Sequence, residues 1–268
     1  MALKDNSIAV VTGAGSGMGQ ASADLLSEAG WPLLLCDIDP AKLEATAKRL
    51  GARGKVETLA GDIAAADYPA RLTQAVGGRQ IGAIVHCAGL SPTMASAARV
   101  LEVNLAGTMR LVEAIRPLMA DGGAAVLFAS SAAHQIGSQL DAVIGKVTTP
   151  EAVASLEQVS PNSGIAYSVS KRGVYLLTRR EAAAFGKRGA RINSISPGII
   201  DTPMGRAEME AHEIMREMID RSALPRAAEA REVASVALFL CSDAASFVTG
   251  IDILVDGGTM AAEAEAQA

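Results

Sequence analysis

Short runs of consecutive apolar residues alternate with longer segments of helical periodicity along almost the whole 268-residue chain. The run at 8–12 precedes a helix expected over 18–29, and the run at 33–36 precedes a helix that begins at Pro40. Continuously apolar strands are typical of a parallel sheet covered on both faces, and parallel strands need crossover connections. The alternation therefore predicts an α/β fold, a doubly wound parallel sheet with helices on both faces.

The same rhythm predicts one domain over residues 1–259, because no change of composition marks a boundary. A segment at 132–162 contains no strand pattern, although Thr149 as N-cap and Pro150 as first residue predict a short helix within it. Residues 260–268 contain only Ala, Glu and Gln after Met260, which predicts a frayed helix or a disordered tail.

Composition excludes several classes of function. The formal net charge of −5 opposes binding to a nucleic-acid backbone, and no apolar run is long enough to span a bilayer. The first strand begins within a few residues of Met1, which leaves no room for a signal peptide. The cysteines at 36, 87 and 241 lie far apart in apolar runs, as expected of buried thiols rather than a disulfide or a metal site. These observations predict a soluble cytoplasmic protein without a metal.

A glycine-rich turn, Thr12-Gly-Ala-Gly-Ser-Gly-Met-Gly19, joins the first expected strand to the first expected helix. Glycines at 13, 17 and 19 let the backbone turn tightly and approach a pyrophosphate, which the helix N-terminus attracts. The alternative is an ordinary strand–helix turn, but the position at the start of an α/β pattern favours a Rossmann-type nucleotide site. The spacing is not that of a Walker loop, which disfavours ATP hydrolysis.

Asp37 closes the second expected strand, about twenty residues beyond the glycines. A carboxylate there can accept both hydroxyls of an adenosine ribose and repels a 2′-phosphate, and no Lys or Arg stands beside it. A purely helix-capping role fits Asp39 better, since Asp39 directly precedes Pro40. NAD is therefore predicted in preference to NADP.

Tyr167 and Lys171 lie one helical turn apart at the start of a long apolar segment, so their side chains share a face. A phenol has a pKa of about 10, and a nearby ammonium favours the phenolate and lowers that pKa toward the useful range. Chance spacing on a surface helix is the alternative that this pair alone does not exclude.

Taken together, these residues resemble the short-chain dehydrogenases/reductases, in their compact single-domain branch, over nearly the whole chain. The resemblance rests on the glycine turn, on Tyr167 with Lys171, and on further motifs in the family's order: Gly61-Asp62-Ile63, Cys87-Ala-Gly89, Val103-Asn104, Ser130-Ser131, Pro197-Gly198, Thr202 and Asp256-Gly-Gly258. His86 and Cys87 depart from the pattern, because the family usually has two asparagines there, so the hydrogen bonds at this point are expected to differ.

The resemblance implies a role for each matching residue. Tyr167 would exchange a proton with the substrate oxygen, while Lys171 would hold the nicotinamide ribose and keep the pKa of Tyr167 low. Ser131 would hydrogen-bond that oxygen, and Asn104 would anchor a water in the proton relay. Cofactor contacts are implied for Gly13, Ser16, Gly17, Met18, Gly19, Asp37, Asp62, Ile63, Ala88, Gly89, Tyr167, Lys171, Pro197, Gly198, Ile200 and Thr202.

The resemblance also implies the reaction, which is NAD-dependent hydride transfer between a secondary alcohol and a ketone. Residues 203–222 match the family's substrate lid. The inserted segment at 132–162 resembles that of bacterial 3α-hydroxysteroid dehydrogenase/carbonyl reductase, which indicates a bulky alicyclic or steroid-like small molecule. The alternatives are a 3-oxoacyl-thioester reductase acting on an acyl-carrier protein and a non-catalytic NAD-binding regulator. The family commonly forms homodimers or homotetramers, and the inserted segment adjoins one of the two usual interfaces.

Overall fold

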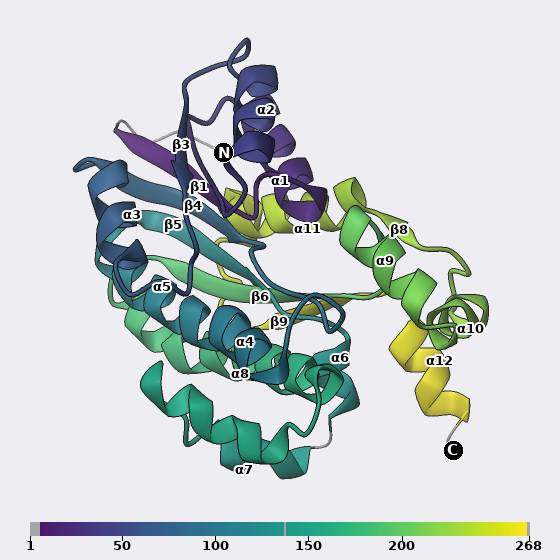
Figure 1. The fold of residues 1–268 in the computed structure, drawn as a ribbon. Coiled ribbons are helices and arrows are strands. Elements are labelled where there is room, and N and C mark those ends of the chain that lie inside the picture. The colour runs from purple at the N-terminus through teal and green to yellow at the C-terminus, as the bar shows by residue number, and fades with distance from the viewer. Residues whose placement is uncertain (1–5, 137, 267–268) are drawn as a thin grey trace.

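The computed structural model describes residues 6–136 and 138–266. Residues 1–5 of the predicted domain, residue 137 of the inserted segment and residues 267–268 of the predicted tail lie outside the described residues. Within the described part, a parallel sheet runs in the order β3-β2-β1-β4-β5-β6-β9 (Figure 1). Its strands are β1 Ser7–Thr12, β2 Leu33–Asp37, β3 Val56–Ala60, β4 Gln80–His86, β5 Met119–Phe128, β6 Arg191–Pro197 and β9 Asp252–Val255.

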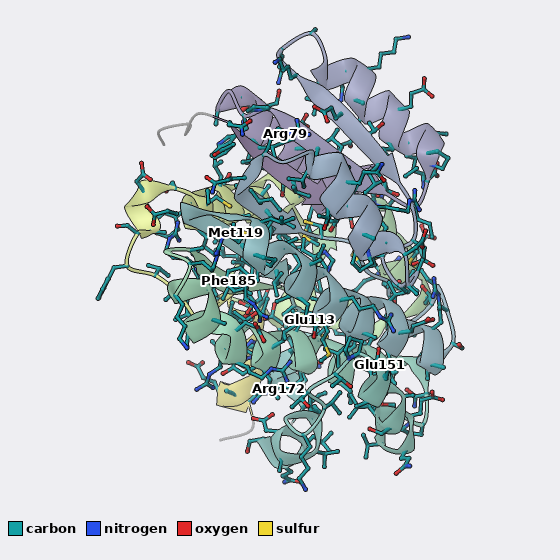
Figure 2. All side chains as sticks on the ribbon, turned by 90° about the vertical axis from the view of Figure 1, so that its left-hand side faces the viewer. Arg79, Glu113, Met119, Glu151, Arg172 and Phe185 are labelled. Carbon is teal, nitrogen blue, oxygen red and sulfur yellow. The ribbon has the colours of Figure 1, made fainter. Side chains whose placement is uncertain are left out.

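Successive side chains of each strand enter two separate cores, which confirms the predicted doubly wound fold. In β1, Ala9 and Val11 point to one face, and Ile8 and Val10 point to the other. The first face is covered by α1 Gly17–Glu28, α2 Pro40–Leu50 and α11 Ala230–Cys241. The second is covered by α3 Tyr68–Val76, α4 Ala97–Leu101, α5 Thr108–Ile115 and α8 Ser163–Gly186 (Figure 1). Met119 and Phe185, labelled in Figure 2, are fully buried in this second core.

The order of strands reverses between β1 and β4, because β1 pairs with β2 on one side and with β4 on the other. In an open α/β sheet, the carboxyl ends of the strands at such a switch point form the crevice in which ligands bind. The glycine turn follows β1, and Cys87 to Gly89 follow β4, so both predicted cofactor segments lie at this point.

The apolar periodicity over 99–119 predicts a single helix, but the structure divides this stretch into several elements. Helix α4 is followed by a π-helical turn, Glu102–Gly107, then by α5 and by a 3₁₀ turn, Arg116–Leu118. Pro117 lies in that last turn, where its missing N–H ends the helix. Strand β5 begins at Met119, before the apolar run at 124–128, and its register against β4 shifts between Ile81 and Ala83.

The inserted segment folds as short helices and contains no strand in its described residues. It consists of α6 Ala132–Gln135, the 3₁₀ turn Ser138–Leu140, α7 Asp141–Ile144 and the 3₁₀ helix Glu151–Val159. The helix expected from Thr149 is therefore 3₁₀, and Pro150 rather than Thr149 occupies its N-cap position. Arg172 of α8 holds α7 through two hydrogen bonds of 2.7 Å to the Asp141 carboxylate, so the segment packs on the outside of α4 and α8 (Figure 2).

The sequence pattern over Glu208–Asp220 predicts one helix, but the lid consists of two. Helix α9, Pro203–Ala211, and helix α10, Ile214–Arg221, are separated at His212, whose φ of −135° and ψ of 99° are extended. The break has a packing cause, because α9 contacts the loop after β4 whereas α10 packs on α12, Thr259–Ala266 (Figure 1). A short parallel pair, β7 Ile200–Asp201 with β8 Ala228–Glu229, joins the two ends of the lid. Helix α12 also decides between the two predictions for the tail in favour of a helix.

In the described part of the chain, every helix is too short or too polar to cross a membrane.

Candidate active site

A cleft of about 760 Å³ opens at the carboxyl ends of β4, β5 and β6, beneath the lid. Much of its wall is apolar, with thioethers and aliphatic side chains from the lid and from the loop after β4. The predicted site residues that line it are Met18, Gly89, Ser131, Tyr167, Lys171, Pro197, Gly198, Ile200 and Thr202. The other predicted residues, among them the glycines of the turn, Asp37, Asp62 and Asn104, do not line this cleft.

The glycine turn has the close backbone approaches that its spacing predicts. Gly13 has φ +68°, and a Cβ there would lie 2.9 Å from the Ala88 nitrogen. A Cβ on Gly19 would overlap the carbonyl of Gly13. Ser16 is the N-cap of α1, and its side chain makes no capping hydrogen bond, so that hydroxyl and the first N–H groups of α1 can meet a pyrophosphate.

Asp37 faces this turn from the end of β2. Its Oδ2 accepts a hydrogen bond of 2.8 Å from the Gly15 N–H, and its Oδ1 accepts one of 2.9 Å from the Asp39 N–H. Asp39 caps α2 by accepting from the N–H groups of Ala41 and Lys42, which confirms that capping is its role rather than that of Asp37. Gly15 is a site residue that the glycine spacing does not single out, and a Cβ there would lie 2.8 Å from the Asp37 carboxylate.

Two predicted cofactor contacts, Asp62 and Ile63, interact with other residues of the protein. The Asp62 carboxylate forms an ion pair with Arg99 and accepts a hydrogen bond from the Ala64 N–H. The Ile63 side chain is buried and packs within 3.1 Å of the position that a Cβ on Gly107 would take. Ile63 can therefore offer only its backbone to a cofactor.

Tyr167 and Lys171 both reach the cleft from α8, with the Lys171 Nζ 5.7 Å from the centre of the Tyr167 ring. The Lys171 Nζ donates a hydrogen bond of 2.8 Å to the Phe128 carbonyl, which fixes it at the end of β5. Burial raises the pKa of Tyr167, and the Ser130 hydroxyl only partly offsets that rise. The direction of this shift is thus opposite to the one expected from the Tyr–Lys spacing.

Ser130, rather than Ser131, supplies the hydroxyl that interacts with Tyr167. Both serines line the cleft, but Ser131 opens α6 and donates its N–H to the Pro197 carbonyl at 2.8 Å. The Ser130 Oγ accepts a hydrogen bond of 3.2 Å from the Ala132 N–H, and the Ser130 hydroxyl lowers the pKa of Tyr167. The structure therefore adds Ser130 to the candidate catalytic residues, while the role of Ser131 stays a prediction.

Asn104 lies in the π-helical turn, an irregularity often found at functional sites. Its side chain is fully engaged, because Oδ1 accepts from the Leu90 N–H at 2.7 Å and Nδ2 donates to the Leu90 carbonyl at 2.9 Å. Its backbone carbonyl accepts a hydrogen bond of 2.7 Å from the Thr108 hydroxyl. Asn104 thus fixes the loop after β4 that borders the cleft.

His86 makes the hydrogen bonds at the position where an asparagine was expected. Its Nε2 lies 2.9 Å from the Thr108 Oγ1, and its Nδ1 lies 2.6 Å from the Thr12 Oγ1. Because the Thr108 hydroxyl donates its hydrogen to Asn104, Nε2 must carry the ring hydrogen and Nδ1 must accept from Thr12. Burial, followed by the charge of Lys171, lowers the pKa of His86 to about 3, so this bridge is neutral.

Burial also lowers the pKa of Lys171 from 10.5 to about 8. Below pH 8 the folded protein carries a buried ammonium, which lowers the free energy of unfolding. This destabilisation is relieved as the pH rises from about 8 to 10.5. At pH 7 we expect Lys171→Met to be more stable than the wild type by about 1–2 kcal/mol. This difference is the cost of the buried ammonium less the contribution of the lost hydrogen bond to the Phe128 carbonyl. Urea unfolding should show this advantage shrinking between pH 8 and 10.5. An advantage that is constant with pH would contradict the assignment.

The described residues contain no group of three or more His, Cys, Asp or Glu side chains that could hold a metal ion.

Comparison with known proteins gives matches over nearly the whole chain. A family model for short chain dehydrogenase matches residues 7–143, and one described as Enoyl-(Acyl carrier protein) reductase matches residues 145–260. The chain is 36% identical over 264 residues to short-chain dehydrogenase/reductase bsc3 of Alternaria brassicicola, covering 94% of this chain and 95% of that protein. It is 33% identical over 260 residues to 3-alpha-hydroxysteroid dehydrogenase/carbonyl reductase of Comamonas testosteroni, covering 94% and 96%.

The fold is matched as completely as the sequence. The crystal structure of the 3-alpha-hydroxysteroid dehydrogenase from Pseudomonas sp. B-0831, complexed with NADH, has a TM-score of 0.79 at 28% identity and covers 98% of this chain and 99% of that chain. Since sequence, fold and the placing of Tyr167 beside Lys171 agree, this chain belongs to the short-chain dehydrogenase/reductase family of oxidoreductases.

Proposed function

We propose that the protein is an NAD-dependent dehydrogenase that interconverts a bulky secondary alcohol and its ketone. The observation that carries this proposal is the placing of Tyr167 and Lys171 on one wall of a large cleft whose other walls are mostly apolar. The glycine turn, with Asp37 facing it, supports NAD as the cofactor.

The residues around the glycine turn fit a dinucleotide. The α1 N-terminus suits the pyrophosphate, and the Asp37 carboxylate suits the two hydroxyls of an adenosine ribose. Lys171, Pro197 and Thr202 border the place for the nicotinamide end. When bound, NAD would accept a hydride from the alcohol carbon, and NADH would return it to the ketone.

The protein's own residues handle the proton that accompanies the hydride. During reduction, the Tyr167 hydroxyl donates a proton to the carbonyl oxygen, and during oxidation its phenolate takes that proton back. The neighbouring serine hydroxyls stabilise the oxygen as charge develops on it. The Lys171 ammonium favours the phenolate, and the positive charge of oxidised nicotinamide would act in the same direction.

The cleft supports a bulky, weakly polar substrate. Met204, Met215 and Met218 line it from the lid, and Leu90 lines it from the loop after β4. Flexible thioethers adapt to irregular apolar ligands. The similarity to a hydroxysteroid dehydrogenase favours an alicyclic or steroid-like ring, whereas the enoyl-reductase model over 145–260 favours the alternative, a 3-oxoacyl-thioester reductase. A non-catalytic regulator would not need Tyr167, Lys171 and the serine pair together.

A substrate screen tests this proposal. Ketones and secondary alcohols, including steroids, cyclic ketones and 3-oxoacyl esters, are followed by NADH absorbance in both directions. Turnover of cyclic ketones or alcohols with NAD(H) is expected, and turnover confined to oxoacyl thioesters would favour the alternative. The same assay on Ser130→Ala and Ser131→Ala shows which hydroxyl serves the substrate oxygen.

We propose a homodimer through the β9 edge of the sheet, in preference to a homotetramer. The inserted segment covers α4 and α8, whereas β9 is an edge strand with Ile251 and Leu254 partly exposed and Phe247 fully exposed beside it. An exposed apolar edge of this kind is typical of an interface.

We expect light scattering to give the mass of a dimer for the wild type. Phe247→Ser should raise the dimer dissociation constant by about tenfold or more, because buried aromatic anchors dominate interfaces. Met94→Ser, which removes an exposed apolar side chain elsewhere, is the matched control. A wild-type tetramer, or a Phe247→Ser variant that dimerises as tightly as the wild type, would contradict this arrangement.

We also propose a cytoplasmic location, because the thiols of Cys36, Cys87 and Cys241 are free, as in a reducing compartment.

A further inference from the structure

The lid carries a buried carboxylate into the substrate cleft. Glu208, on the inner side of α9, is only 7% exposed and lines the same cleft as Tyr167. It accepts a hydrogen bond of 3.0 Å from the Thr93 N–H and another from the Thr93 hydroxyl. These bonds join the lid to the loop after β4, across the mouth of the cleft.

This carboxylate is ionised at neutral pH. Burial alone would raise the pKa of Glu208, but hydrogen bonds from Ser91 and Thr93, together with the nearby His212, hold that pKa below its ordinary value. The His212 Nε2 lies 3.6 Å from the Glu208 carboxylate, yet half of the His212 side chain is exposed. An imidazole that is half exposed is screened by solvent and cannot cancel the charge of Glu208 fully.

The charge of Glu208 extends to the reacting atoms. The charge of Glu208 raises the pKa of Tyr167, although less than burial does. The surroundings of the phenol therefore already disfavour a further negative charge. Among the described residues that line the cleft there is no arginine, and the basic side chains are those of Lys171 and His212. Lys171 is held by the Phe128 carbonyl and His212 lies beside the Glu208 carboxylate, so neither side chain is left to pair with an anionic substrate.

We propose that Glu208 is a specificity-determining residue that makes the cleft select neutral ketones and alcohols and reject substrates with a carboxylate on the same ring. The physical basis is repulsion between like charges in a site of low dielectric constant. This inference rests on the proposed function and narrows its substrate class. Glu208 would then have two separable roles. Its hydrogen bonds from Thr93 need an acceptor but not a charge, whereas the repulsion of an anionic substrate needs the charge.

The test compares two ligands with the same ring, 4-methylcyclohexanone and 4-oxocyclohexanecarboxylate. Dissociation constants are measured by titration calorimetry in the presence of NADH. Turnover is prevented either by a pH at which the wild type is inactive or by introducing Tyr167→Phe into every protein. Glu208→Gln keeps an acceptor for Thr93 and removes the charge. We expect it to tighten the carboxylate relative to the methyl ketone by about tenfold. Glu210→Gln, two positions further along and on the exposed side of α9, makes the same change of charge and should leave the ratio unchanged.

A third variant isolates the contact between lid and loop. Thr93→Val removes the hydroxyl and keeps the charge of Glu208, so the wild-type preference for the neutral ligand should persist while both ligands bind more weakly. The proposal is overturned if Glu208→Gln and the wild type have the same ratio of dissociation constants, or if Glu210→Gln changes that ratio equally. Because these ratios do not depend on turnover, a failure of the proposed activity in the substrate screen is a separate and distinguishable result.

Discussion

Replacing Tyr167 with Phe should lower kcat by about a thousandfold or more while leaving the dissociation constant for NADH close to that of the wild type. In the proposed mechanism the phenol exchanges a proton with the substrate oxygen, and general acid–base catalysis contributes about 10²–10⁴ in rate. The ring itself, which lies beside Lys171, is retained in phenylalanine. Single-turnover reduction measures the chemical step, and fluorescence titration measures cofactor binding.

Tyr175 provides the matched control for this variant. It lies two turns further along α8, where its hydroxyl accepts a hydrogen bond from Arg179 and its ring packs against Arg172. Tyr175→Phe makes the same chemical change on the same helix and should leave kcat unchanged. If Tyr167→Phe reduced its best ketone at the wild-type rate, another group would have to supply the proton.

The features that the sequence predicts correctly are those that follow from a local pattern of residues. The strands of the sheet are continuous apolar runs, and the glycine turn follows the first of them directly. Tyr167 and Lys171 come from one helix, so a spacing of four residues is enough to bring their side chains together. Asp37 is predicted from its place at the end of a strand, and the parallel register of β1 and β2 brings it to Gly15.

The features that the sequence does not reveal depend on contacts between distant segments or on a local change of geometry. Thr93 and Glu208 are 115 positions apart, and neither stands in a motif that indicates the other. The π-helical turn at Asn104 adds a residue to a helix whose apolar periodicity shows no interruption. Ser130 and Ser131 are adjacent at the point where β5 passes into α6, so only the geometry of that turn decides which hydroxyl faces Tyr167.

The lid gives a further example of the same limit. The spacing of its methionines is compatible with one continuous helix, and no Gly or Pro at His212 predicts the break. The two halves separate because α9 is held to Thr93 by Glu208 while α10 packs on α12. Tertiary packing decides where these helices end, because tertiary contacts routinely override the helix propensity of a sequence.

Asp37→Ala should change the preference for NAD over NADP, measured as the ratio of their kcat/KM values, by about a hundredfold toward NADP. In the proposed function, the wild-type carboxylate at the end of β2 would accept from both ribose hydroxyls and repel a 2′-phosphate. The variant removes both effects and leaves the N–H groups of Gly15 and Asp39 free to donate to a phosphate oxygen. Initial rates with each cofactor at a fixed concentration of the best alcohol give the ratio.

Asp39→Ala distinguishes this local effect from a general loss of negative charge. Asp39 lies two positions further along and caps α2, so its removal should cost about 1 kcal/mol of stability and leave the cofactor ratio unchanged. Both variants lose one carboxylate from the same loop, but only Asp37 faces the glycine turn. Equal kcat/KM values for NAD and NADP in the wild type would mean that the carboxylate of Asp37 does not contact the ribose. A shift of equal size in Asp39→Ala would instead assign the preference to the charge of the loop as a whole.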